Sequence, residues 1–377
     1  MILYILFYLL FAVNCYLTIA RKKSSAIVVL SLLLFGFMFT FNAGLEGDHE
    51  TYKDLFFYPD LEISKDLMFF YFIKLVRLLG VSNYNLFLFI EYIIGLGLIT
   101  LGVKSVTTNY HPMIAVAMLY IFPHCAVAIR FYLAFSIIIF SLRYFINRRL
   151  ARNKIFYILC IIIASLFHAC VSVFLLTIPL VFTKENFYQN KSWRITSSLF
   201  LIFSGILIII FYTYKDSYAL TLIVNLLEED AGGRGAGYFQ SIDYSHGALI
   251  GLPIYFIGLI LSHRFFLFGT HNNDKNDEKI ARMCKVISSV HCLYIIWIIT
   301  LVFMFLDMTF IRVLFIPSVV VLLAYGRILD SGGYSKHFIR VNSLLFILIL
   351  LSWEVVNNVG LYSISSNMWI KEALRFF

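Results

Sequence analysis

Long apolar stretches separated by short basic segments dominate this 377-residue sequence, and they restrict it to one class of fold. Apolar residues make up 61% of the chain and charged residues only 14%, with a mean hydropathy of +0.88. Soluble domains are about half apolar and about a quarter charged. Inside a bilayer, only helices and closed barrels pair all their backbone polar groups, and a spanning helix needs about 20 apolar residues. The pattern therefore predicts an all-α, polytopic integral membrane protein.

The apolar segments predict about 11–12 transmembrane or half-membrane helices. No polar stretch is long enough for a separate domain, so residues 1–377 are expected to form a single membrane domain. Residues 67–79 are too short to span, and with Lys74 and Arg77 they predict an interfacial amphipathic helix whose basic residues lie near lipid phosphates. The expected spans are residues 2–20, 26–42, 86–103, 112–128, 130–146, 195–213, 247–264, 286–306, 313–329 and 341–361.

The distribution of Lys and Arg predicts which loops lie in the cytoplasm. A basic cluster between two spans, Arg148, Arg149, Arg152 and Lys154, is expected there. The acidic loop 43–66 and the loop 214–246 then face outside. The net charge of +9 is attributed to this positive-inside bias and not to nucleic-acid binding.

The apolar segment 155–182 is too long for one ordinary span and too short for two of the usual length. It forms either one tilted helix or two short helices that meet near His168. The basic residues Lys184, Lys191 and Arg194 follow it. Their loop lies in the cytoplasm only if the segment turns back, so the positive-inside rule favours a hairpin.

This topology gathers several polar side chains on the outer face, and it predicts an outward-facing polar cavity. Ionisable groups at membrane depth are costly and therefore suggest function. Several arginines around one cavity predict a ligand with two or more negative charges, because guanidinium groups bind phosphate through two hydrogen bonds. The candidates are Asp48, Tyr52, Arg130, His168, Arg234 and Arg312.

Each candidate also has a structural explanation. Arg130 and Arg312 could extend to lipid headgroups, His168 could bond to a neighbouring helix, and Asp48 and Tyr52 could be ordinary loop residues. The six cysteines include no CxxC pair, and the histidine spacing contains no zinc motif or catalytic triad. No metal is therefore predicted.

Three motifs resemble the EpsG-like family of polysaccharide polymerases, a branch of the Wzy and O-antigen polymerase group. Residues 47–52 (GDHETY) are similar to the family's G-D-x-x-x-Y pattern, and residues 130–134 (RFYLA) place an arginine at the start of a membrane helix. Residues 164–172 (ASLFHACVS) resemble its A-x-x-F-H segment, and residues 312–314 (RVL) give a weaker match. The family often has a second glycine where this chain has Glu46.

The resemblance implies a multi-pass glycosyltransferase of the bacterial inner membrane. It would join undecaprenyl-diphosphate-linked oligosaccharide repeat units on the outer face without a metal or other cofactor. A flippase and a chain-length regulator are further expected partners, beside the membrane lipid. Arginines suit the departing diphosphate, and histidine or carboxylate suits a general base. Arg130, with Arg312 or Arg234, is therefore expected to bind the diphosphate. His168 or Asp48 is the expected base, and Glu46 could replace them in that role. Tyr52 and Glu46 are expected to make further contacts with the substrate.

Other functions remain open at this point. A lipid-linked oligosaccharide flippase or another transporter would need groups accessible from both sides, and an O-antigen-ligase-like glycosyltransferase would use a similar outer site. A structural subunit would not need Arg130 and His168 at depth. A membrane acyltransferase would place Asp or Asn near its histidine, and none lies near His168 in sequence.

Overall fold

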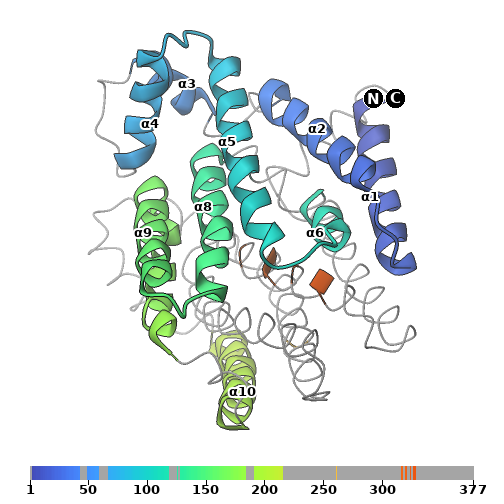
Figure 1. The fold of residues 1–377 in the computed structure, drawn as a ribbon, viewed down its shortest axis with the longest axis vertical. Coiled ribbons are helices and arrows are strands. Elements are labelled where there is room, and N and C mark those ends of the chain that lie inside the picture. The colour runs from blue at the N-terminus through green and yellow to red at the C-terminus, as the bar shows by residue number, and fades with distance from the viewer. Residues whose placement is uncertain are drawn as a thin grey trace.

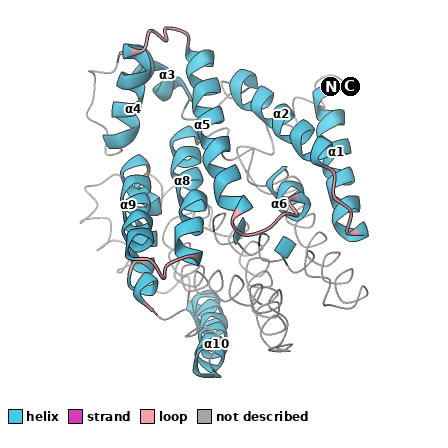
Figure 2. Cartoon of the chain, in the orientation of Figure 1, coloured by secondary structure: helices cyan, strands magenta, loops and turns pink. Residues whose placement is uncertain are grey.

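The computed structural model describes residues 2–42, 49–58, 67–118, 125, 128–183 and 191–214, and positions 260, 316, 319, 320, 323, 326 and 327. Every regular element within these ranges is helical (Figures 1 and 2). The elements are α1 (Ile2–Ala20), α2 (Ser25–Asn42), α3 (His49–Phe57), α4 (Leu67–Leu78), α5 (Tyr84–Lys104), α6 (His111–Val116), α8 (Ile129–Ile146), α9 (Ala151–Phe167), the 3₁₀ helices η2 (Ala169–Thr177) and η3 (Pro179–Phe182), and α10 (Lys191–Tyr214).

Most predicted spans within the described ranges coincide with helices, namely α1, α2, α5, α8 and α10. Among the described helices, α5 and α8 are long and apolar enough to cross a membrane, and shorter apolar helices accompany them. The positions described between 316 and 323 are helical and buried with the 3–4-residue spacing of one helix face. The spans predicted at 247–264, 286–306 and 341–361 and the loop 214–246 lie almost entirely outside the described residues, and of 112–128 only its first part forms α6.

Two short helices, α3 and α4, precede the long helix α5. The sequence predicted α4 but treated residues 43–66 as a loop, whereas the structure has α3 within it. The Nη1 atom of Arg77 in α4 donates to the carbonyl of Phe57, 2.8 Å away, at the carboxyl end of α3. A cation at a helix carboxyl end donates to a terminal carbonyl and interacts favourably with the helix dipole. Arg77 therefore links α4 to the end of α3, and its expected contact with lipid phosphates stays a prediction.

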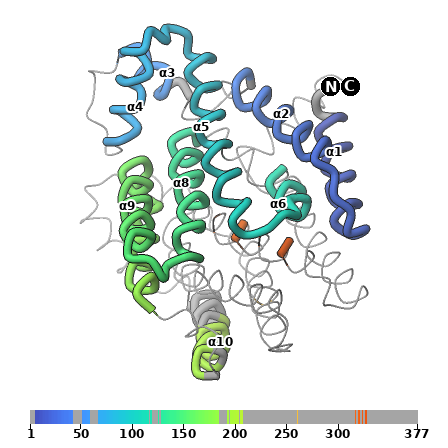
Figure 3. The backbone as a smooth tube through the Cα atoms, viewed as in Figure 1, coloured from blue at the N-terminus to red at the C-terminus, as the bar shows by residue number. Residues whose placement is uncertain are grey.

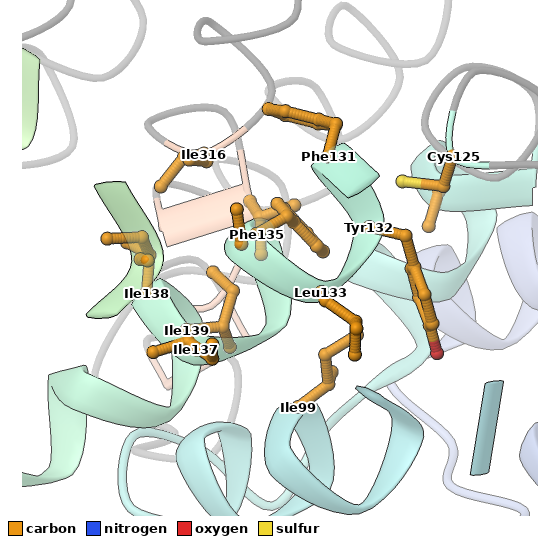
Figure 4. Packing of buried hydrophobic residues seen from close by; sticks show 14 of the residues in the cluster. Ile99, Cys125, Phe131, Tyr132, Leu133, Phe135, Ile137, Ile138, Ile139 and Ile316 are labelled. Carbon is orange, nitrogen blue, oxygen red and sulfur yellow. The ribbon is translucent and has the colours of Figure 1, made fainter. Parts of the chain in front are cut away.

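Helices α5 and α8 run in the same direction and touch along most of their length (Figure 1). Two glycines of α5 permit this approach. A Cβ at Gly95 would overlap the ring of Tyr132, and one at Gly102 would overlap the backbone at Ile139. Between them, Ile99 of α5 faces Leu133 of α8 in the central core (Figure 4).

Residues 151–183 form a hairpin that turns at His168 (Figure 3). The basic residues that follow this segment in the sequence had favoured a hairpin over one tilted helix. The hydroxyl groups of Tyr157 and Thr177 bond across the two arms at 2.6 Å. At the open end Arg148, which is 1% exposed, donates to the carbonyls of Phe145 (3.1 Å) and Thr183 (3.4 Å). Arg148, predicted as part of the cytoplasmic basic cluster, thus joins α8 to the end of the hairpin.

The second arm explains how so short a segment can form two arms that each approach the length of a membrane span. A 3₁₀ helix rises about 2.0 Å per residue, so Ala169–Phe182 reaches about 28 Å. The α-helical arm Ala151–Phe167 reaches about 26 Å at about 1.5 Å per residue. Both lengths approach the roughly 30 Å of a hydrocarbon core. Buried Val171, Phe174 and Thr177 recur every third residue, which is the period of a 3₁₀ helix.

A buried polar network joins α1, α2 and α6. The Nε2 atom of His111 accepts the Ser24 amide at 2.9 Å, so its Nδ1 carries the proton and donates to Asn14 Oδ1 at 2.7 Å. Asn14 Nδ2 in turn donates to Ser31 Oγ at 3.0 Å. Both ring nitrogens of His111 are therefore used in its neutral form.

The contact between α5 and α8 predicts unequal effects of alanine at two glycines of one helix. Gly102→Ala should lower the free energy of unfolding by about 1–3 kcal/mol, because a helix backbone must move to admit the methyl group. Gly97→Ala should raise it by about 0.5–1 kcal/mol, since a Cβ there meets nothing within 4 Å. Thermal unfolding of both variants in detergent would check this. Equal effects would contradict the close contact.

The network predicts a pH dependence of stability. Burial, followed by the charge of Lys23, lowers the pKa of His111 from 6.5 to about 4. The folded protein therefore binds fewer protons than the unfolded chain between these values, and stability should fall by about 1–3 kcal/mol as pH drops from about 6.5 to about 4. Denaturant unfolding of the wild type and of His111→Gln at several pH values measures the difference. If the two profiles run parallel, His111 is not the group responsible.

Candidate functional site

The first turn of α8 presents Arg130 to Tyr52 of α3. Arg130 Nε donates to the Tyr52 hydroxyl at 3.1 Å, and the guanidinium carbon lies 4.9 Å from the centre of the Tyr52 ring. Tyr52 is 2% exposed and packs edge-on against Phe69 of α4, with ring centres 5.9 Å apart. The amphipathic pair α3 and α4 therefore fixes the tyrosine, and the tyrosine orients the half-buried arginine.

The position of Arg130 makes the electrostatic potential at this end of α8 positive. The helix begins at Ile129, and its N-cap residue Ala128 provides no side-chain hydrogen bond. A helix amino terminus carries roughly half a positive charge, so a cation in the first turn is locally unfavourable. The same arrangement favours an anion, which the guanidinium group of Arg130 can bind.

His168 forms the turn of the hairpin. It ends α9 and caps η2, where its Nδ1 accepts the backbone N–H of Cys170 at 3.4 Å. Its half-buried ring stands edge-on to Phe131, with centres 5.8 Å apart. A neutral imidazole that accepts at Nδ1 carries its proton on Nε2. His168 therefore has a hydrogen-bond donor on the ring edge opposite to the cap.

The structure brings Tyr52, Arg130 and His168 to the same end of the α8–α9 pair. These helices are antiparallel, so the start of α8 lies beside the end of α9 (Figure 1). Phe131 follows Arg130 in the chain and contacts His168. Glu46, Asp48, Arg234 and Arg312 lie outside the described residues. Among the described residues, no three His, Cys, Asp or Glu side chains cluster as metal ligands do.

The sequence analysis missed Glu91, a carboxyl group inside α5. The side chain is 0% exposed, and neither of its oxygens has a hydrogen-bond partner among the described residues. It shares the buried face of α5 with Tyr84 and Tyr92. The signal was present in the sequence as one acidic residue within an apolar span, but the sequence analysis considered acidic residues only in the loops.

These features are those of a helical membrane protein in which Tyr52, Arg130 and His168 lie at one end of the core helices. The family model that matches the chain is EpsG, over residues 25–364, and the protein belongs to the EpsG family. This is a family of the polysaccharide-polymerase type, as the motifs around Tyr52, Arg130 and His168 indicated. Comparisons with curated proteins and with solved structures gave no match.

Proposed function

We propose that the protein is a polysaccharide polymerase of the bacterial inner membrane. It joins undecaprenyl-diphosphate-linked oligosaccharide repeat units in a polar cavity open to the outer face, and it crosses the membrane with about 11–12 helices or half-helices. The observation that carries the proposal is Arg130, held by Tyr52 at the uncapped start of α8 and next to the hairpin turn at His168. Family membership supports the same substrate class.

The reaction needs charge stabilisation more than it needs bond polarisation. An acceptor hydroxyl oxygen attacks the anomeric carbon, the bond from that carbon to the diphosphate breaks, and undecaprenyl diphosphate leaves. Negative charge grows on the departing oxygen, where fixed cationic donors lower the barrier. Arg130 supplies this stabilisation, with Arg312 or Arg234 as a second cation. No metal is required by this scheme.

A base must accept the proton of the acceptor hydroxyl. His168 and Asp48 are the candidates, with Glu46 as a substitute and Tyr52 and Glu46 as further substrate contacts. The bond from the Cys170 amide favours His168 with its proton on Nε2, which is a donor and not an acceptor. This supports Asp48 as the base and His168 as a donor to the substrate.

The fate of the lipid-linked repeat unit tests the function. Cells lacking the protein should accumulate single repeat units on the outer face of the membrane. Loss of a flippase would leave them on the inner face, and loss of an O-antigen-ligase-like enzyme would leave long lipid-linked chains. Purified protein in proteoliposomes should convert single units into longer ones. Failure to do so with correctly oriented protein would overturn the proposal.

Replacement of Arg130 tests binding of the leaving group. Arg130→Lys keeps the charge but loses the planar donor fork, so the polymerisation rate should fall about 10- to 100-fold. Arg143→Lys is the matched control, because Arg143 lies in the last turn of the same helix and packs on Phe140 and Tyr144. It should retain the rate. If both variants polymerise at the wild-type rate, Arg130 only anchors the helix.

Two amides separate the roles of His168. Gln can place an N–H near the position of Nε2, whereas Asn can replace only the Nδ1 acceptor that caps η2. A donor role predicts that His168→Gln stays within about tenfold of the wild type and that His168→Asn loses about 10²-fold, both as folded proteins. A base role predicts that both lose about 10²–10⁴-fold. Initial rates in proteoliposomes distinguish the two, and equal severe losses would restore His168 as the base.

A further inference from the structure

Among the residues that the structure describes, Glu91 has no hydrogen-bond partner that accounts for it. Many of the other buried polar side chains in the described ranges do: Asn14 bonds Ser31, His111 bonds Ser24, and Ser136 bonds the carbonyl of Tyr132. A buried carboxyl group without a hydrogen bond costs several kcal/mol relative to water, and an ionised one costs far more. An apolar side chain would fill the same place at no such cost. A bound ligand that hydrogen-bonds the carboxyl group is the physical explanation to test.

The helix places this carboxyl toward the protein interior. Glu91 belongs to the buried face of α5, together with Tyr84, Phe87, Leu88 and Tyr92. That face packs on α2 and α8. The opposite face is exposed at Phe89, Ile93 and Ile94, where a lipid would lie. A lipid-facing or solvent-facing explanation therefore does not apply to Glu91.

The contact between the parallel helices sets its depth. Gly95 lies against Tyr132 and Ser136 of α8. Glu91 lies one turn earlier, about 6 Å nearer the start of α5. By the same register, it is level with the first turn of α8, which carries Arg130.

Packed aromatic rings connect α5 with the tyrosine that holds Arg130. Phe87, on the buried face of α5 with Glu91, packs on Phe69 of α4 with ring centres 6.3 Å apart, and Phe69 packs on Tyr52 at 5.9 Å. Tyr52 accepts the hydrogen bond of Arg130. The helix face that carries the carboxyl group and the residue that carries the guanidinium therefore border the same aromatic cluster at a similar depth.

We propose that Glu91 is a further ligand-binding residue of this site: a protonated carboxyl that donates a hydrogen bond to an oxygen of the lipid-linked diphosphate. The inference rests on the proposed function, since it takes the diphosphate from that substrate. Charge complementarity favours the protonated form, because an ionised carboxylate at the depth of Arg130 would repel the diphosphate. A neutral acid adds a donor to the site without adding negative charge.

Infrared spectroscopy tests the protonation state without any assay of activity. The difference spectrum between the wild type and Glu91→Gln in nanodiscs should contain the carbonyl stretch of a protonated carboxyl. Undecaprenyl diphosphate should shift that band to lower frequency, as donation to a phosphate oxygen does. A spectrum with only the carboxylate stretch, or a band that undecaprenyl diphosphate leaves unmoved, overturns the proposal.

Binding of undecaprenyl diphosphate to purified protein gives the second measurement. A hydrogen bond to a charged group is worth about 1.5–3 kcal/mol, so Glu91→Leu should weaken binding about 10- to 100-fold. Glu91→Gln, which retains a donor, should stay within a few-fold. Thr40→Val is the matched control, because the Thr40 hydroxyl is also buried and lacks a partner among the described residues. It should bind like the wild type. Wild-type affinity of a folded Glu91→Leu overturns the proposal.

Two further ligands identify what the site recognises. If the site recognises the diphosphate on its lipid carrier, inorganic pyrophosphate should compete only weakly with undecaprenyl diphosphate for binding, and phosphatidylglycerol should not compete. Strong competition by phosphatidylglycerol overturns the assignment. The outcome is separable from the polymerase proposal. Protein that binds undecaprenyl diphosphate through Glu91 but makes no polymer would overturn the function and leave this inference in place. Polymerisation by Glu91→Leu at the wild-type rate would overturn this inference and leave the polymerase function in place.

Discussion

The close parallel contact between α5 and α8 is the constraint on which the described part of the structure depends. Gly95 and Gly102 let the two backbones approach until Tyr132 and the Ile139 carbonyl lie against α5. Inside a membrane, association of helices depends on such packing, because lipid tails are as apolar as the side chains. The contact fixes the rotation and depth of both helices. It therefore decides that Glu91 faces inward and that Arg130 is level with it.

The helices around this pair orient the remaining polar groups. Helix α9 packs antiparallel on α8, so the turn of the hairpin falls beside Phe131. Helices α3 and α4 place the Tyr52 hydroxyl against Arg130. At the other end Arg148 closes the hairpin onto α8. The candidates that the structure describes, Tyr52, Arg130 and His168, are thus held by helices that pack on, or next to, the central pair.

The sequence predicted the features that depend on hydropathy and charge alone. The helices α1, α2, α5, α8 and α10 follow from apolar length, and the turn at His168 follows from the side on which basic loops are expected. The 3₁₀ arm could not be predicted, because the α and 3₁₀ forms of one apolar segment differ by only a small change in backbone angles. The helix α3 was missed since its sequence, HETYKDLFF, is too polar and short to stand out from a loop.

There is a physical reason why the sequence did not single out Glu91. Whether a polar group inside a span is satisfied depends on the rotation of its helix against neighbours, which hydropathy does not encode. His111 is satisfied by Ser24 and Asn14, from two other segments far away in sequence. Glu91 lacks any such partner among the described residues. From sequence alone the two residues look equivalent, as single ionisable groups beside apolar runs, and only the packed helices separate a structural group from a functional candidate.

Charge explains why the proposed site would combine unlike groups. A diphosphate needs cations to bind, yet a product that is bound too strongly leaves slowly, so interactions that strengthen only as the leaving group departs raise the rate most. Arg130 at the start of α8 provides a permanent positive potential. Neutral donors, which the proposals assign to His168 Nε2 and the Glu91 carboxyl, gain strength as negative charge grows on the oxygen they contact. One fixed cation with neutral donors beside it would therefore favour the departing diphosphate over the bound lipid-linked substrate, which is the distinction a polymerase must make at every added unit.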